Sequence, residues 1–414
     1  NNLINMDMSK YRCTQPFSHL HVKPRGVVTP CCLYDWTKND SWKRDNSSYG
    51  LKIQKGIDNI LHSDEWRKIQ DKSNNNIKEA GCWNCYFREE AGSTSRRMWM
   101  NERHPDGDKE IKLINLELQL GAKCNLECRM CSSGNSNKLL KEDSMTYFGK
   151  LDKEWMRKTQ EYSNWIYDEK VWDDIKKHSK HLQVLQFAGG EPLLIQQQYD
   201  YLEWLAENNL DPIIQYITNA TIGVDDYKKT VWNNFSDVSF DFSIDGVGAT
   251  GEYLRTGSVW EKQVENIKSY IAYREERKKL NKDTRLHWST CISIMNITEI
   301  KPILDFMYDL GLEKSNWSLN IVSEPDWMDV ENLYGKEKRY ALSKIQEILD
   351  DSKYQEKHKK TLQTVVSRIG SNPSDTLDFI EKIVKKDTTH NTVNQSRKID
   401  YPTTFPQWWN VLTN

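Results

Sequence analysis

The stretch that most constrains this chain is a run of cysteines that follows a short alternating strand. Over residues 124–131 the sequence is CNLECRMC, which places Cys124, Cys128 and Cys131 at C-x3-C-x2-C spacing. Three thiolates this close together on one loop fit three corners of a cubane iron–sulfur cluster and leave one iron open to a small molecule. A zinc site or three unrelated core thiols are the alternatives, although structural zinc usually takes four ligands.

The remaining cysteines also occur in groups. Of the nine cysteines in the chain, five lie in the first 85 residues. They are Cys13, the adjacent pair Cys31-Cys32, and Cys82 with Cys85, which form a C-x2-C pair. Such grouping in a long chain favours metal ligation in a reducing cytoplasm over a disulfide scaffold. We therefore expect a cytoplasmic protein.

Length and charge narrow the classes of function. A chain of 414 residues is expected to form two or three domains. The formal net charge of -2 argues against a general nucleic-acid or membrane binder. We see no apolar run of about 18 residues that would span a membrane and no signal peptide.

The first hundred residues are expected to form a small, irregular unit. Segments 18–22 and 27–29 alternate like strands and flank a Pro-Arg-Gly turn, and a helical pattern covers 57–69. This hairpin ends at a Pro-Cys-Cys sequence. The thiols that could form one four-ligand set are Cys13, Cys31, Cys82 and Cys85. Cys32 can replace Cys31 or remain a free thiol, and a zinc ribbon stays open as an alternative.

From about residue 109 to 322 the chain alternates strands and helices, which is typical of an α/β fold with a parallel sheet. Asn296 or Thr298 is expected to cap the helix over 297–310, and Gly311 to end it. The strands are expected at 111–120, 182–188, 212–219, 236–244, 285–294 and 316–322, with helices at 197–208, 259–279 and 297–310. We assign no role to the charged insertion 142–181.

Beyond residue 324 the pattern is helical, over roughly 334–351, 355–370 and 373–386. An aromatic tail, Phe-Pro-Gln-Trp-Trp at 405–409, closes the chain. It is expected to be a docked C-terminus, with a lid as the alternative.

Several of the expected strands carry a polar face. The strand at 116–120 places Glu117 and Gln119 on one side, since strand side chains alternate. The expected strand at 236–244 places Ser239, Asp241 and Ser243 on one side. The expected strand at 285–294 likewise carries a polar side, formed by His287, Ser289, Cys291 and Ser293. A packed barrel interior would be filled with branched aliphatic residues. These polar faces instead indicate an interior lined for a polar ligand.

The cysteine loop after a first strand, together with the motifs that follow it, resembles the radical S-adenosylmethionine (SAM) superfamily. Gly189-Gly190-Glu191 follows the strand 184–188 and matches that family's GGE motif. The sequence at 218–220 resembles its Thr-Asn-Gly motif with alanine in place of glycine, and 243–246 resembles S-x-D-G. Met130 stands where the family usually has an aromatic residue. The residues that the resemblance assigns to SAM are Gly189, Gly190, Glu191, Asn219, Ser243, Asp245, Arg255 and Met130.

The same resemblance implies a partial (β/α)6 barrel over 105–325, followed by a helical extension over 326–414. The order of elements in 1–104 resembles the Twitch/SPASM auxiliary-cluster module, which here precedes the barrel. Because it holds only enough cysteines for one cluster, it resembles the shorter Twitch type. The chain looks similar to Twitch-containing radical SAM proteins of marine bacteria and phages. The implied cofactors are SAM, a SAM-binding [4Fe-4S] cluster and one auxiliary cluster, expected as [4Fe-4S].

The resemblance implies reductive cleavage of SAM to a 5′-deoxyadenosyl radical that abstracts hydrogen from a polar small molecule such as a sugar, cyclitol or nucleotide. Modification of a peptide side chain is the alternative, and a zinc-binding adaptor is the non-enzyme alternative. The implied electron donor is of the flavodoxin or ferredoxin type. Candidate catalytic residues are Cys291 as a hydrogen-atom donor and His287 and Asp241 as acid or base, although each also fits a packing role.

Overall fold

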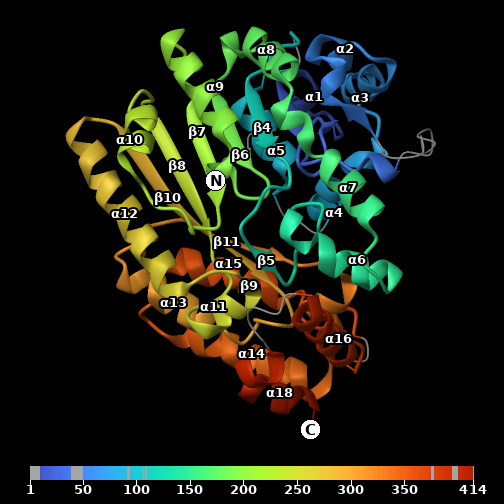
Figure 1. The fold of residues 1–414 in the computed structure, drawn as a ribbon, viewed down its shortest axis with the longest axis vertical. Coiled ribbons are helices and arrows are strands. Elements are labelled where there is room, and N and C mark those ends of the chain that lie inside the picture. Colours follow the sequence, from blue (N-terminus) through green and yellow to red (C-terminus); the bar gives the residue numbers. More distant parts are fainter. Residues whose placement is uncertain are drawn as a thin grey trace. The chain divides into compact units, whose positions relative to one another are not determined.

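The computed structural model describes residues 10–38, 50–90, 94–105, 107, 110–373, 377–393 and 400–413 (Figure 1). The chain divides into two compact units. The first comprises Asn1–Ala122, Glu161–Gln215 and Asn234–Ser236, and the second comprises Lys123–Gln160, Tyr216–Asn233 and Asp237–Asn414. The domain boundaries near 104 and 325 stay a prediction.

The first unit contains a mixed sheet with parallel and antiparallel neighbours. Its hydrogen-bonded order is β7-β6-β4-β1-β2-β3. The strands are β1 (His19–Val22), β2 (Val27–Thr29), β3 (Leu51–Lys52), β4 (Asn115–Gln119), β6 (Val184–Ala188) and the start of β7 (Ile213–Thr218). The expected hairpin is confirmed as β1 and β2, which pair antiparallel. Strand β1 also pairs in parallel with β4, which the sequence did not indicate.

One expected helix of the first unit is broken in two. The pattern over 57–69 forms α2 (Ile57–Leu61) and α3 (Asp64–Asn74) instead of a single helix. Ser63 separates them because its side-chain oxygen accepts a hydrogen bond from the Trp66 backbone N–H and so caps α3. The other helices are α1 (Gln15–Ser18), α4 (Trp83–Glu90), α5 (Arg96–Arg103), α8 (Glu169–Lys177) and α9 (Gln196–Glu207).

The second unit contains the strands that follow β7. Strand β8 (Asp237–Ser243) pairs in parallel with β10 (Asp283–Ile292), which pairs in parallel with β11 (Trp317–Ile321). Helix α12 (Trp260–Lys279) packs on β10 (Figure 1), and α15 (Glu356–Val366) packs on β11. Along β10 the apolar side chains are buried and alternate with partly exposed polar ones, which is the pattern expected from the sequence. The α/β class is confirmed, with a mixed and mostly parallel sheet.

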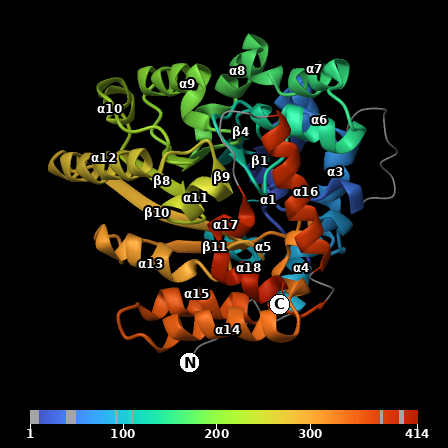
Figure 2. The ribbon, with the colours of Figure 1, turned by 60° about the horizontal axis from the view of Figure 1, so that its bottom comes forward.

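The C-terminal part of the second unit is helical, as expected. Figure 2 shows α16 (Leu377–Val393) beside α6 (Leu140–Phe148), with which it is in contact. The Trp408 indole donates to the Ile294 carbonyl at 2.7 Å, so the aromatic tail is a docked C-terminus. The remaining helices are α7 (Lys153–Glu161), α10 (Asp226–Trp232), α11 (Ala249–Leu254), α13 (Ile300–Asp309), α14 (Gly335–Asp350), α17 (Tyr401–Thr404) and α18 (Pro406–Thr413).

The expected cap of α13 is wrong. Glu299 is the residue that precedes the helix, and it makes no side-chain capping hydrogen bond. The Asn296 side chain is used elsewhere, because its oxygen accepts from the Ser293 backbone N–H and its amide donates to the Asp245 carbonyl. Gly311 follows the helix with a φ of 69°, a backbone conformation that favours glycine at a helix end.

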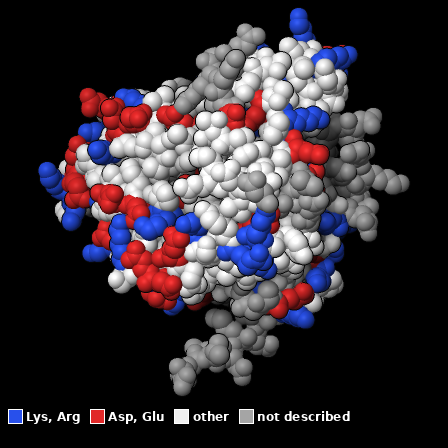
Figure 3. All heavy atoms as spheres, turned by 90° about the horizontal axis from the view of Figure 1, so that it is seen from below, with Lys and Arg blue, Asp and Glu red and all other residues white. Residues whose placement is uncertain are grey.

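The surface carries both signs of charge. On the face drawn in Figure 3, Lys and Arg side chains lie next to Asp and Glu side chains, which fits a net charge of -2. None of the helices in the described ranges is long and apolar enough to cross a membrane.

Candidate active site and auxiliary cysteine cluster

The cysteine loop is hydrogen-bonded to the segment that follows β8. Its short strand β5 (Glu127–Cys128) pairs antiparallel with β9 (Arg255–Thr256), so that Cys128 lies opposite Arg255. The Arg129 backbone N–H donates to the Leu254 carbonyl at 2.8 Å. Two regions of the sequence that the resemblance assigned to SAM are thereby brought together within the second unit.

The three thiols of this loop lie within electrostatic reach of one another. Burial raises the pKa of the Cys128 thiol well above its ordinary value, and the thiols of Cys131 and Cys124 raise it further, against the opposing effect of Arg255. Burial also raises the pKa of Cys131, to about 11. Thiols in such a setting ionise only when a cation compensates the charge, as the irons of a cluster do. The donor set therefore fits a cluster.

Asn219 lies next to the first cysteine of the loop, as the motif suggested. Its side-chain amide is 4.0 Å from the Cys124 sulfur and donates to the Asn125 side-chain oxygen at 3.0 Å. Ala220, which stands where the family has glycine, is fully buried and has a φ of 58°. This left-handed backbone explains why glycine suits the position.

Asp245 and Arg255 form a buried ion pair. The Arg255 Nη2 atom lies 2.7 Å from the Asp245 Oδ2 atom, and the other carboxylate oxygen accepts a hydrogen bond from the Cys291 backbone N–H. Burial disfavours the charge on Arg255, but the Asp245 carboxylate raises the pKa of the guanidinium above its usual range. Arg255 Nε is buried and makes no hydrogen bond to any described residue, so one donor remains for a ligand.

The polar face of β8 and β10 is present, and it holds Asp241, His287 and Cys291. Asp241 lies opposite His287 in the strand register and accepts a hydrogen bond from the Ser289 hydroxyl at 2.7 Å. Burial raises the pKa of Asp241 to about 6 and the pKa of Cys291 to about 12. At neutral pH Cys291 is therefore a protonated thiol, and Asp241 titrates near physiological pH.

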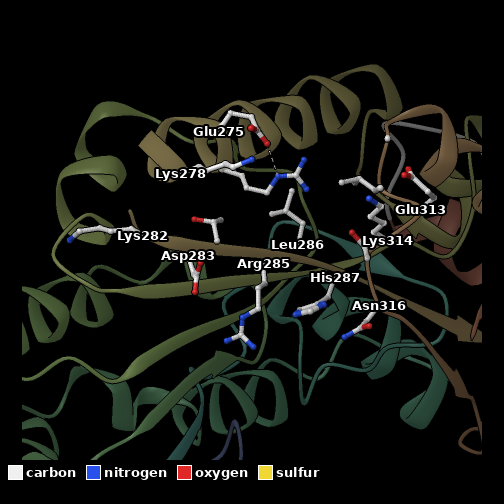
Figure 4. Close-up of a pocket in the computed structure, with 15 residues that line it drawn as sticks. Glu275, Lys278, Lys282, Asp283, Arg285, Leu286, His287, Glu313, Lys314 and Asn316 are labelled. Atoms are coloured by element: carbon white, nitrogen blue, oxygen red, sulfur yellow. Dashed lines mark hydrogen bonds and ion pairs between the residues drawn. The ribbon is translucent and has the colours of Figure 1, made fainter. Parts of the chain in front are cut away.

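His287 lies on β10, four residues before Cys291, which is about 13 Å along the strand. It lines a separate cavity of about 720 Å³ near the start of β10, shown in Figure 4. The other residues of this cavity are mostly charged and include Arg274, Lys278, Lys282, Asp283, Arg285 and Glu313.

Replacing Asp241 by asparagine is expected to flatten the pH dependence of stability. Because the pKa of Asp241 is higher in the folded chain, the folded state retains its proton longer as the pH rises. The stability that Asp241 contributes through this proton is therefore lost as the pH rises from 3.8, the ordinary pKa of the carboxyl, to about 6. Urea unfolding at pH 5 and pH 8 should show that the free energy of unfolding falls more between these two pH values in the wild type than in Asp241→Asn. An equal loss in both proteins would contradict the prediction.

The GGE segment belongs to the first unit, where it contacts the end of β4. A Cβ atom on Gly189 would lie 2.6 Å from the Leu120 backbone nitrogen, and its φ is 119°. Both facts require glycine at this position. The Gly190 N–H donates to the Gly121 carbonyl. Glu191 is buried, and its carboxylate caps the short helix that follows by accepting from the Leu193 N–H at 3.1 Å.

The auxiliary cysteines lie in the first unit and influence one another electrostatically. Burial raises the pKa of Cys82 well above its ordinary value, and the thiols of Cys13, Cys31 and Cys85 raise it further. Cys31 is buried, whereas Cys32 is exposed. We therefore assign Cys31, and not Cys32, to the four-cysteine auxiliary set. That these thiols bind a metal stays a prediction.

A buried polar network adjoins these cysteines, and the sequence indicated only part of it. Glu117 of β4 accepts a hydrogen bond from Arg96 at 2.5 Å and lies 3.5 Å from the His19 ring. His21 lies opposite Glu117 in the register and bonds to the Thr29 hydroxyl at 2.9 Å. Arg96 and Glu117 form an ion pair that the alternation of polar residues in one strand could not reveal, because Arg96 lies on α5.

A cavity of about 670 Å³ adjoins the cysteine loop within the second unit. Met130 and Cys131 line it together with residues of α6, the segment after β11 and α16. A volume of this size is typical of small-molecule sites. Among the described residues, no group of three or more His, Cys, Asp or Glu side chains is placed to hold a single metal ion.

Residues 13–86 match the family model described as SPASM, an iron–sulfur cluster-binding domain. A comparison with curated proteins found no match. The match includes Cys13, Cys31, Cys82 and Cys85, which are the cysteines assigned above to the auxiliary set.

Among solved structures, the chain is similar to anSMEcpe with bound AdoMet and Kp18Cys peptide, at 14% identity and a TM-score of 0.36, covering 56% of this chain and 59% of that one. It is also similar to Streptococcus suis SuiB bound to precursor peptide SuiA, at 12% identity and a TM-score of 0.35, covering 67% of this chain and 62% of that one. The chain thus spans less than two thirds of the length of these proteins.

Residues 13–86 are therefore similar to a SPASM iron–sulfur cluster-binding domain. The cysteine loop and the motifs that follow it lie outside this match.

Proposed function

We propose that this chain is a radical SAM enzyme that binds SAM at an iron–sulfur cluster on the cysteine loop. It would remove a hydrogen atom from a polar substrate and pass an electron to an auxiliary cluster held by residues 13–86. The observation that supports this most directly is the loop that gathers Cys124, Cys128 and Cys131 beside β9 and a ligand-sized cavity. When bound to the reduced cluster, SAM supplies a 5′-deoxyadenosyl radical that abstracts hydrogen. The partial (β/α)6 barrel that the sequence motifs imply is part of this proposal.

Several side chains and backbone groups of the chain would bind SAM. Arg255 can grip the SAM carboxylate through its unpaired Nε donor while Asp245 balances its charge. Gly189 and Gly190 expose backbone for the amino group, Ser243 and Asp245 would lie near the ribose, and Met130 would pack on the adenine. Asn219 would orient the loop at Cys124.

As the alternative to electron transfer to the auxiliary cluster, Cys291 is proposed as the hydrogen-atom donor that quenches the substrate radical, which leaves the substrate at its original oxidation level. A thiol must carry its hydrogen to donate it, and the raised pKa of Cys291 keeps it protonated. Asp241, with a pKa of about 6, is proposed as the base that accepts a substrate proton. His287 stays a weaker proposal because it lines a different cavity.

The substrate class remains a choice between two proposals. We take a peptide side chain as the first candidate, because solved structures similar to the chain include anSMEcpe and SuiB with bound peptides. Their TM-scores lie below 0.5, so this likeness only sets the order of testing. A polar small molecule, the expectation from the sequence, is the second candidate and is supported by the polar face of β8 and β10.

The proposal is tested by metal analysis and SAM turnover on the full chain after anaerobic reconstitution. Two cubane clusters require about eight irons and about eight sulfides per chain. With dithionite or reduced flavodoxin as electron source, we expect SAM to be converted to 5′-deoxyadenosine. Zinc in place of iron, or a fully loaded chain that does not cleave SAM, would contradict the proposal and favour the adaptor.

A further inference from the structure

Helix α16 of the C-terminal extension is tied directly to the cysteine loop. Arg129, which lies between the ligands Cys128 and Cys131, is fully buried. Its Nη2 atom lies 3.2 Å from the Asp387 Oδ1 atom of α16, and its guanidinium stacks over the Tyr253 ring at 4.9 Å. A side chain 258 positions further along the chain thus balances the positive charge inside the loop.

Asp387 is held in place from two further directions. Its Oδ1 atom accepts a hydrogen bond from the Tyr253 hydroxyl at 2.9 Å, and its Oδ2 atom accepts from the Tyr401 backbone N–H at 2.8 Å. Tyr253 immediately precedes Leu254, whose carbonyl accepts from the Arg129 N–H. Asp387 therefore joins the cysteine loop, α11 and α17 through one carboxylate.

A second contact ties the same helix to the start of α6. Glu142 is almost completely buried, and its two carboxylate oxygens accept hydrogen bonds from Lys386 at 2.7 Å and from His390 at 2.8 Å. His390 also lies 3.7 Å from Glu127 of the loop. Residues 386–390 of α16, a little more than one helical turn, therefore contact the segment from 127 to 142 on both sides of Cys131.

The charges in this arrangement matter because a buried charge beside a cluster acts through a low dielectric. The Nε, Nη1 and Nη2 atoms of Arg129 make no geometrically good hydrogen bond to any described residue, so Asp387 is the main compensation of its charge. Removing one partner of a buried pair leaves an uncompensated charge, whereas removing both partners is tolerated far better.

We propose that α16 positions the cysteine loop and that Asp387, by balancing Arg129, keeps the SAM-binding cluster at a low reduction potential. This inference rests on the proposed function, since it needs a cluster on Cys124, Cys128 and Cys131. Asp387 and Arg129 are positioning residues and do not react. The C-terminal extension is then part of the cofactor site, because α16 also forms one wall of the cavity beside Cys131.

The test compares the cluster in the wild type, Asp387→Asn and the double variant Asp387→Asn/Arg129→Gln of the full chain. Redox titration followed by electron paramagnetic resonance measures the potential and its response to added SAM. In Asp387→Asn the potential should move to a more positive value, because the unpaired guanidinium favours the reduced cluster. In the double variant it should return towards the wild-type value, because no charge is left unpaired.

The matched control is Asp378→Asn, which neutralises another aspartate of α16 whose partner Lys382 is exposed to solvent. It should leave the potential unchanged. If Asp387→Asn takes up no cluster while the double variant does, the pairing is confirmed by cluster loading instead. Wild-type potentials in all variants, or equal failure of the single and double variants, would overturn the proposal. A wild-type chain without a SAM-responsive signal would overturn the proposed function itself.

Discussion

Replacing Cys128 by alanine is expected to abolish formation of 5′-deoxyadenosine. Cys128 lies on β5, opposite Arg255, and is one of only three thiols in its loop, so its loss leaves two ligands for a cubane cluster. About four of about eight irons should be lost, because the auxiliary cysteines are separate. Iron, sulfide and 5′-deoxyadenosine are measured on the same reconstituted sample.

Cys291→Ala is the matched control for this loss. Cys291 is a thiol of the same unit, and its backbone N–H contacts Asp245, but it is not part of the cysteine loop. This variant should keep its full iron content and still produce 5′-deoxyadenosine, while turnover of substrate falls if Cys291 donates a hydrogen atom. Normal SAM cleavage in Cys128→Ala would show that the cluster assignment is wrong.

Replacing Cys31 by serine is expected to remove the auxiliary cluster, whereas replacing Cys32 is not. Cys31 is buried, and its carbonyl accepts a hydrogen bond from the Thr29 hydroxyl, so its position is fixed by the hairpin. Burial raises the pKa of its thiol well above the ordinary value, and the thiols of Cys32, Cys13 and Cys85 raise it further. Cys32 is exposed and free to remain outside the ligand set.

The two variants are compared by iron content and by the signal of the auxiliary cluster in electron paramagnetic resonance. Cys31→Ser should lose about four irons and retain the SAM-responsive signal, because the cysteine loop is intact. Cys32→Ser should match the wild type in both measurements. The reverse result would assign Cys32 as the ligand, and full iron in both variants would show that another group replaces either thiol.

Local patterns in the sequence predicted most strands of the two units. The expected strand at 236–244 is β8, Asp237–Ser243, and the one at 285–294 is β10, Asp283–Ile292. Alternation of polar and apolar residues is a strong signal for a half-buried strand, so these boundaries are set by the residues themselves. The polar face with Asp241 and Cys291 followed from the same alternation.

What the sequence did not reveal depends on contacts between distant residues. The pairing of Asp387 with Arg129 joins positions that no local pattern connects. Ser63 breaks the expected helix because its oxygen caps α3, and a serine between two helical stretches gives only a weak signal for this. Asn296 is a good capping residue by type, but its hydrogen bonds to Ser293 and Asp245 take it out of that role.

The parallel pairing of β1 with β4 joins the cysteine-bearing hairpin to the main strands of the first unit. Strand β1 lies between Cys13 and Cys31 in the sequence. A metal that binds only the folded chain stabilises every element whose order is required for binding. Iron bound at these auxiliary cysteines would thus stabilise β4 as well as the hairpin. Loss of that metal would then loosen the sheet of the first unit beyond the segment that carries the thiols.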